Sequence, residues 1–193
     1  MNKLIGYAFD MLPSRKRIRE EIARYPHRGR MVDLGCGAGH STFYLSLVSD
    51  QVIGIDSDEK KIGIARKRYP QLTFQTADAS RTGYSNGYFD TAFMTMFLHK
   101  ACCDDIIAEA CRIAGEVVVI DYSRLLYGFR GFFIRLIKKD SYKKYADSNL
   151  LLPFAGLGFS LRESRSIHPN LFIHIFARAK ASHKANVVNF VQT

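Results

Sequence analysis

Three alternating glycines stand directly behind a short apolar run that carries an acid, in Met31-Val32-Asp33-Leu34-Gly35-Cys36-Gly37-Ala38-Gly39. Glycine has no Cβ, so the backbone can turn sharply here and approach a ligand closely. The segment that follows is compatible with a helix, whose first N–H groups lack intrahelical partners. This order is typical of a nucleotide-cofactor site at the carboxyl end of a first strand. A dinucleotide fingerprint needs its third glycine at position 40, where the chain has His40.

Acidic residues also end the next two strand-like runs, 51–56 and 72–78. Asp56 lies nineteen residues after Gly37, and Asp78 closes the third run. A carboxylate at the end of a second strand can accept hydrogen bonds from both ribose hydroxyls of an adenosine. Each acid has a structural alternative, because aspartate also caps helices and forms turns. Acids at three successive strand ends favour a binding edge over three separate caps.

The G-x-G-x-G spacing behind Asp33, with acids at the next two strand ends, resembles the motifs of the class I S-adenosylmethionine (SAM)-dependent methyltransferases. The resemblance is closest to the group of quinone-precursor and phospholipid methyltransferases. It implies SAM as cofactor, with Asp56 on the ribose, Asp78 facing the adenine amino group, and Asp33 supporting the glycine loop and the methionine end. The cofactor-binding set that it implies is Asp33, Gly35, Gly37, Asp56, Ser57, Asp78, Ala79 through its N–H, and Thr95.

Apolar runs that alternate with helix-compatible segments predict an α/β fold. After the first run at residue 31, strands are expected at 51–56, 72–78, 89–95, 116–122, 159–167 and 171–179, the last two joined by a turn at Pro169-Asn170. The resemblance implies a Rossmann-like three-layer sandwich with a seven-stranded, mostly parallel sheet and one antiparallel strand. We expect a single domain at 1–180, with a helical lead (1–29) and a substrate-side insertion (123–158). A polar tail follows at 181–193.

One histidine stands where a base could meet an incoming nucleophile. His99 follows the fourth predicted strand in Leu98-His99-Lys100, where the resembled small-molecule enzymes often have Leu-His-His. A base assists methyl transfer only if the acceptor arrives protonated. Because Lys100 replaces the second histidine, we favour a structural histidine that anchors the next helix. His99 remains the one candidate catalytic residue.

Charge is divided between the predicted cofactor domain and the segments around it. Residues 31–122 hold eight Lys/Arg and twelve Asp/Glu (−4); residues 1–30 hold eight and three (+5), 123–150 seven and two (+5), and 151–193 five and one (+4). In the resembled fold the lead and the insertion pack where the acceptor enters. A basic rim concentrates anionic partners. We therefore expect a small-molecule or lipid-like acceptor, and the rim favours an anionic one.

The apolar, cationic run 125–139 has two interpretations. As a lid helix it would pack its apolar face on the sheet edge. As an interfacial helix it would make peripheral membrane contact, with aromatic side chains inserted and Lys/Arg at the headgroups. Its two glycines weaken a free helix, so we favour the lid. Tyr142, Tyr145 and Phe154 then either line the acceptor pocket or pack in the core.

Missing signatures narrow the acceptor. No Asn/Asp-Pro-Pro-Tyr/Phe follows the fourth strand, which argues against adenine-N6 and cytosine-N4 methylation. No Pro-Cys or Thr-Cys pair occurs near strands four and five, which argues against RNA cytosine-C5 methylation. The net charge of +10 keeps an RNA methyltransferase as one alternative, although nucleic acid is the less favoured partner. A non-catalytic SAM-binding or interaction protein is the other. The four cysteines form no C-x-x-C pair, so we expect reduced thiols, no metal and a cytoplasmic protein.

Overall fold

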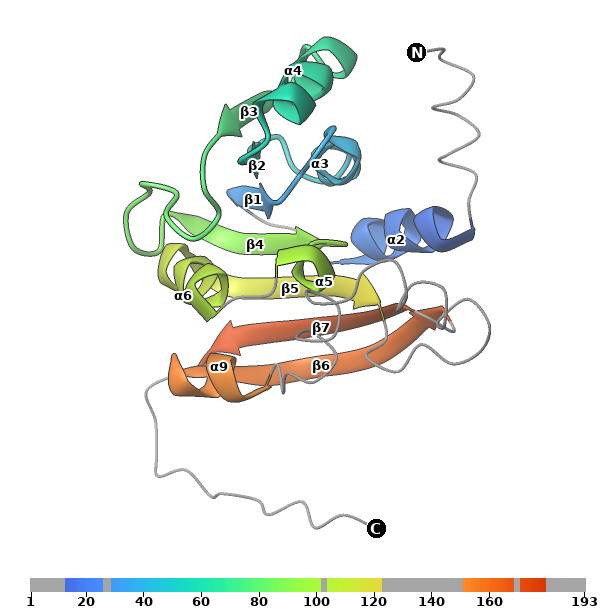
Figure 1. The fold of residues 1–193 in the computed structure, drawn as a ribbon. Helices are drawn as coiled ribbons and strands as arrows, with labels where there is room; N and C mark the ends of the chain where they lie inside the picture. The colour runs from blue at the N-terminus through green and yellow to red at the C-terminus, as the bar shows by residue number, and fades with distance from the viewer. Residues whose placement is uncertain (1–12, 26–28, 102–103, 123–150, 169–170, 180–193) are drawn as a thin grey trace.

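A seven-stranded sheet forms the centre of the computed structural model, which describes residues 13–25, 29–101, 104–122, 151–168 and 171–179. The strand order is β3-β2-β1-β4-β5-β7-β6 (Figure 1). The strands are β1 (Met31–Leu34), β2 (Val52–Asp56), β3 (Thr73–Thr76), β4 (Phe89–Thr95), β5 (Ala114–Tyr122), β6 (Phe159–His168) and β7 (Leu171–Arg178).

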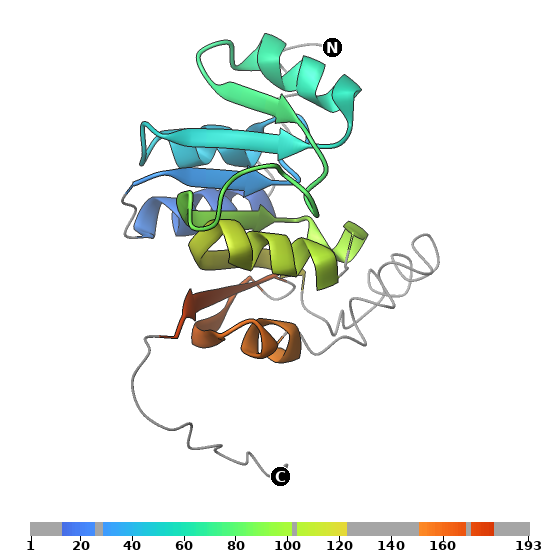
Figure 2. The same ribbon diagram turned by 90° about the vertical axis from the view of Figure 1, so that its left-hand side faces the viewer.

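Helices cover both faces of this sheet, which makes the three layers that the sequence predicts (Figures 1 and 2). The described helices are α2 (Pro13–Arg24), α3 (His40–Ser46), α4 (Glu59–Arg68), α5 (Leu98–Ala101), α6 (Asp104–Ile113) and α9 (Leu151–Gly156). On one face, Ile22 of α2 belongs to the same buried cluster as Phe93 of β4. On the other, Ile107 of α6 and Phe154 of α9 pack with Val117 of β5. Burial of these side chains is the main force that holds the layers together.

The sheet is parallel except at β7, which runs antiparallel to both of its neighbours, β5 and β6. The predicted fold class, including its single reversed strand, is therefore confirmed. The fourth strand has the predicted bounds, Phe89–Thr95. The third ends at Thr76 instead of Asp78, because the chain leaves the ladder there and turns around the Asp78 side chain.

Parallel pairing brings the predicted site residues to one edge of the sheet. Leu34 pairs with Ile55 and Asp56 pairs with Thr76, so β1, β2 and β3 end side by side. On the other flank of β1, Asp33 pairs with Phe93 of β4. Ligands of open α/β sheets bind outside the carboxyl ends of the strands. This edge is therefore where a cofactor is expected.

Several predictions concern segments outside the described residues: the beginning of the lead (1–12), the run 125–139 with Tyr142 and Tyr145, and the tail 181–193. Phe154 is described, and it is a core residue. It is 0% exposed, and its ring stacks on Phe176 with 3.7 Å between ring centroids. Within the described ranges, no helix has the length and apolar character needed to cross a membrane.

Candidate cofactor site

Asp33 lies fully buried beneath the glycine turn. Its Oδ2 accepts hydrogen bonds from Ser41 Oγ at 2.6 Å and Thr42 Oγ1 at 2.7 Å, both on α3. Its Oδ1 is also buried and has no hydrogen-bond partner among the described residues. Burial raises the pKa of Asp33 to about 6, although the two hydroxyl groups act to lower it. A buried acceptor without a donor needs an explanation, and a ligand with an N–H group supplies one.

The glycines of the turn have different tasks. All three have positive φ: +73° at Gly35, +56° at Gly37 and +83° at Gly39. A Cβ on Gly35 would lie 2.3 Å from the Phe97 ring, and one on Gly39 would lie 2.8 Å from the Phe74 ring. At Gly37 the nearest atom would be Lys61 Cδ, at 3.9 Å. Gly35 and Gly39 thus allow close packing inside the protein, whereas Gly37 faces open space that a ligand can occupy.

Asp56 joins the ends of β1 and β2. Its Oδ2 accepts a hydrogen bond from Gly37 N at 2.8 Å, and its Oδ1 accepts one from Asp58 N at 2.9 Å. Each carboxylate oxygen keeps further acceptor capacity. The helix cap belongs to its neighbour, because Asp58 Oδ1 accepts from Lys61 N at the start of α4. Asp56 is therefore free of the capping role, and the exposed Ser57 lies beside it.

Asp78 holds a tight turn just beyond β3. Its Oδ1 accepts from Ser80 N and Ser80 Oγ, both at 2.8 Å, and these bonds lower the pKa of Asp78. Arg81 N donates to Asp78 O at 3.0 Å and closes the turn. Asp78 is exposed at the sheet edge, while Ala79 is buried in the core beneath it. Asp78 thus forms a turn and also presents an ionised carboxylate.

The chain after β4 is strained where it passes the glycine turn. Thr95 is 8% exposed, and its Oγ1 has no hydrogen-bond partner among the described residues. Met96 follows with φ +54°, in the left-handed region, which costs a non-glycine residue roughly 1–3 kcal/mol. Phe97 then packs its ring against Gly35. No local pattern in the sequence marks Met96 or Phe97, because the positions of both depend on contacts with distant strands.

His99 is held by a buried carboxylate at the end of β5. Its Nδ1 lies 2.6 Å from Asp121 Oδ1, and its backbone N–H donates to Asp121 Oδ2 at 3.2 Å. Both residues are almost fully buried, at 2% and 1% exposure. Tyr122 packs edge-on against the imidazole. The arrangement fastens α5 to β5, and Asp121 could have been found because the fifth strand also carries an acid near its end.

The thiols and acids of the described residues show no second chemistry. Cys36 is buried within the glycine turn, and burial raises the pKa of its thiol, which stays protonated. Cys102 and Cys103 lie outside the described residues. Across the described part of the chain, no group of three His, Cys, Asp or Glu side chains could hold a metal ion.

Relatives of known class share the strands around this edge. A family model described as a methyltransferase domain matches residues 31–117. An uncharacterized methyltransferase of Synechocystis is 32% identical over 111 residues, which are 54% of this chain and 52% of the relative. A trans-aconitate 2-methyltransferase of Variovorax paradoxus is 41% identical over 64 residues, 31% of this chain and 25% of the relative. The chain thus spans about half the length of the first relative and a quarter of the second.

A solved structure agrees at the level of the fold. The magnesium protoporphyrin IX methyltransferase of Synechocystis, crystallised with SAM, superposes with a TM-score of 0.60 at 18% identity, covering 86% of this chain and 81% of that one. The sheet topology and the glycine turn beside Asp56 define a Rossmann-like class of protein. The match over residues 31–117 and the methyltransferase relatives support the class I SAM-dependent methyltransferase family for this chain.

Proposed function

We propose that this protein transfers the methyl group of SAM to a small, anionic acceptor. One observation carries the proposal. The turn at Gly37 opens onto free space, and its N–H is bonded to the Asp56 carboxylate at 2.8 Å. An open turn with a carboxylate at the second strand end suits an adenosine-containing ligand. The methyltransferase relatives support SAM as that ligand. Bound SAM supplies an electrophilic methyl group on a sulfonium sulfur.

The adenosine half would be held by two strand ends. Asp56 accepts the ribose hydroxyls, with Ser57 beside it. Asp78, whose carboxylate is exposed and ionised, accepts the adenine amino group. The Ala79 N–H meets the ring. Each of these roles is proposed from position at the sheet edge together with the family resemblance.

The methionine half would meet two buried polar atoms. Asp33 pairs with Phe93 in the sheet, and Thr95 follows Phe93 by two residues, so both side chains point to the α3 face. Asp33 Oδ1 and Thr95 Oγ1 are the atoms that lack partners among the described residues. An ammonium group donates up to three hydrogen bonds, and Asp33 Oδ1 offers an acceptor for one of them. Gly35 contributes indirectly, by admitting Phe97 beside the turn.

Charge supports an anionic acceptor. The chain carries 28 Lys/Arg against 18 Asp/Glu, with the excess outside residues 31–122. On the described helix α2, Lys16, Arg17 and Arg24 are exposed, and each also forms an ion pair with Glu20 or Glu21 of the same helix. The V. paradoxus relative is named for trans-aconitate, a small organic anion. A basic surround would raise the local concentration of such a molecule and keep its nucleophilic oxygen ionised.

Positioning is the main catalytic contribution that we propose for the protein. The acceptor atom attacks the methyl carbon in line, and the carbon–sulfur bond breaks as the new bond forms. Alignment of two reacting groups is worth effective molarities of about 10⁵ M or more. His99 is not needed as a base when the acceptor is already ionised. Its burial and its bonds to Asp121 support an anchoring role for the loop after β4.

A product search tests this proposal. Wild-type protein is incubated with a small-molecule extract and SAM carrying a labelled methyl group, and mass spectrometry identifies molecules that have gained it. The Asp56→Ala variant in the same extract is the control. We expect labelled small acids with wild type and much less label with the variant. Label found only in an RNA fraction would replace the proposal by RNA methylation, and SAM binding without any product would favour a non-catalytic protein.

A further inference from the structure

A twelve-residue connection, 77–88, carries the proposed adenine contacts yet contains no helix or strand. It follows β3 and leads to β4, and Asp78 and Ala79 stand at its beginning. Backbone groups in such a segment must find partners outside regular structure. A connection of this length is ordered only if side chains from its surroundings hold it.

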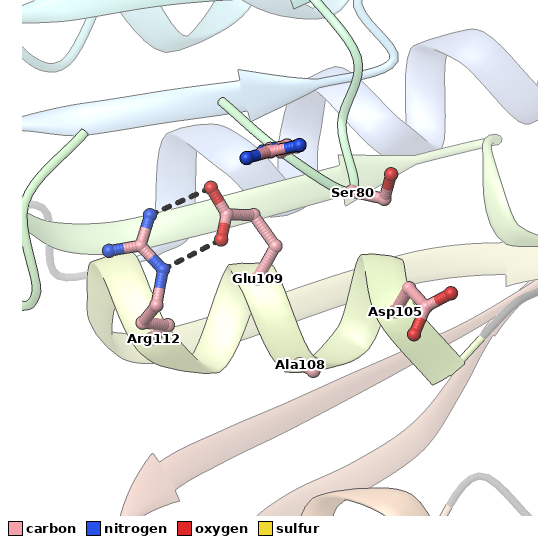
Figure 3. A pocket seen from close by; sticks show the side chains of 6 residues that line it. Ser80, Asp105, Ala108, Glu109 and Arg112 are labelled. Carbon is pink, nitrogen blue, oxygen red and sulfur yellow. Dashed lines mark hydrogen bonds and ion pairs between the residues drawn. The ribbon is translucent and has the colours of Figure 1, made fainter. Parts of the chain in front are cut away.

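Glu109 of α6 holds the middle of this connection. Its side chain is 7% exposed, and its Oε1 accepts from Thr82 N at 2.7 Å and Thr82 Oγ1 at 2.6 Å. The same carboxylate accepts two bonds from Arg112, at 2.7 Å and 2.8 Å (Figure 3). Burial raises the pKa of Glu109, but the bonds from Arg112 and Thr82 outweigh it and the pKa is lowered. Glu109 is therefore an ionised, fully engaged carboxylate.

Arg112 forms further hydrogen bonds with the connection, at residues nearer to β4. Its Nη2 donates to Tyr84 O at 2.7 Å, and its Nη1 donates to Asn86 Oδ1 at 2.8 Å. The Arg112 carbonyl accepts from Gly87 N at 2.9 Å. A guanidinium offers five donors in a rigid fork, which suits it to fix several groups at once. The two side chains thus bond to three residues of the connection, and the Arg112 backbone bonds to a fourth.

A closed turn links the residues that Glu109 and Arg112 bind to the proposed adenine contacts. Arg81 N donates to Asp78 O, and the Asp78 carboxylate accepts from Ser80 N and Oγ. These bonds hold residues 78–81 in one turn, and Thr82 is the next residue along the chain. Ser80, Arg81, Glu109 and Arg112 also line one shallow polar pocket, so the turn and the pair on α6 lie side by side (Figure 3).

We propose that Glu109 and Arg112 are positioning residues for adenine recognition. They touch neither the open space at Gly37 nor the reacting atoms, and they act by fixing the turn that presents Asp78. The proposal rests on the proposed function, because it takes SAM as the ligand and Asp78 as its adenine contact. Loss of Glu109 or Arg112 should reduce the preference for the adenine amino group more than it reduces the overall affinity for the ligand.

Two probes isolate recognition of the adenine amino group. One is S-adenosylhomocysteine, and the other is S-inosylhomocysteine, in which an oxygen replaces that amino group. Their dissociation constants are measured by calorimetry on the full chain. Wild type should prefer the adenosyl probe by about tenfold or more, the value of one hydrogen bond to a charged group. Glu109→Gln keeps the side-chain shape and removes the charge, and it should bring this preference down by about fivefold.

Two further variants make the test decisive. Glu116→Gln removes an ion pair with Arg162 on β5 and β6, away from the connection, and should leave the preference unchanged. Arg112→Lys keeps the positive charge but loses the fork to Tyr84 and Asn86, and should lower the preference like Glu109→Gln. If Glu109→Gln does not fold, Arg112→Lys decides.

The outcomes separate this inference from the function on which it rests. A preference that stays at the wild-type value in both α6 variants overturns the inference, as does an equal loss of affinity for both probes, which would mean that the pair only stabilises the fold. A wild type that binds both probes equally also overturns the inference, because the adenine amino group is then not recognised. A wild type that binds neither probe contradicts the proposed function instead.

Discussion

A Gly37→Val variant tests whether the cofactor occupies the space at this turn. The test needs a control, because any side chain at this backbone geometry also introduces strain. Gly37 has φ +56°, and a Cβ there would meet only Lys61 Cδ, at 3.9 Å. The protein itself therefore leaves room for a Cβ at this position. Gly158, between α9 and β6, is a matched control, since it has φ +76° and no atom within 4 Å of an added Cβ.

Strain should affect both variants equally. A non-glycine residue in the left-handed region costs roughly 1–3 kcal/mol, which corresponds to a fall in Tm of roughly 2–12 °C for a chain of this size. Domains have about 5–15 kcal/mol of stability, so about 95% or more of each variant stays folded. Loss of folded protein cannot then account for a large change in affinity.

Binding should separate the two variants. We expect Gly37→Val to weaken S-adenosylhomocysteine by about 100-fold or more, which is roughly 2.8 kcal/mol or more, and Gly158→Val to bind like wild type. Calorimetry gives the affinity, and thermal unfolding gives the Tm of the same samples. If Gly37→Val binds normally, the cofactor does not lie over this turn. If both variants lose affinity equally, backbone strain explains the effect and the argument from open space is wrong.

Three further predictions concern Asp33, His99 and the run 125–139. Burial raises the pKa of Asp33 from 3.8 to about 6, so its contribution to stability is present below pH 3.8 and lost as pH rises through 6, a cost of about 3 kcal/mol. In urea unfolding, Asp33→Asn should therefore gain stability relative to wild type between pH 4 and 7. A difference in stability that stays constant with pH would refute this. His99→Ala should lower the Tm, because the anchor on Asp121 is lost. Turnover should fall only about tenfold with an unchanged pH profile, against the roughly 10²–10⁴-fold loss expected for a general base. If an ionisation in the wild-type pH profile disappears in the variant, His99 is the base. If 125–139 is a lid, the protein should not sediment with anionic vesicles; salt-sensitive sedimentation that Lys138→Glu with Lys139→Glu abolishes would favour the interfacial helix.

The sheet and its candidate cofactor edge could be predicted because their signals are local. Each strand is an apolar run with its own bounds, and the run 89–95 has the same limits in the structure. Glycine spacing marked the turn at Gly37, and strand-end acids marked Asp56 and Asp78. Parallel pairing then brought these residues to one edge, as the order of strands and helices required.

Contacts between distant residues could not be predicted. Spacing predicts Gly35 as a cofactor residue, but no local pattern predicts that the Phe97 ring packs against it. The bonds between Glu109 and Thr82 join a helix to an irregular connection, and no periodic pattern predicts such a pair. Asp121 followed the pattern of the other strand-end acids, but its bond to His99 needed the three-dimensional arrangement. The domain limits and the cytoplasmic location stay predictions.

Calorimetric titration of the wild-type protein with SAM, S-adenosylhomocysteine and NAD tests the central claim most directly. The account predicts binding of the first two and no binding of NAD. It also predicts that Asp56→Ala weakens SAM by roughly 1–3 kcal/mol, because buried ribose hydroxyls lose their acceptor. Tight binding of NAD with no signal from SAM would contradict the account.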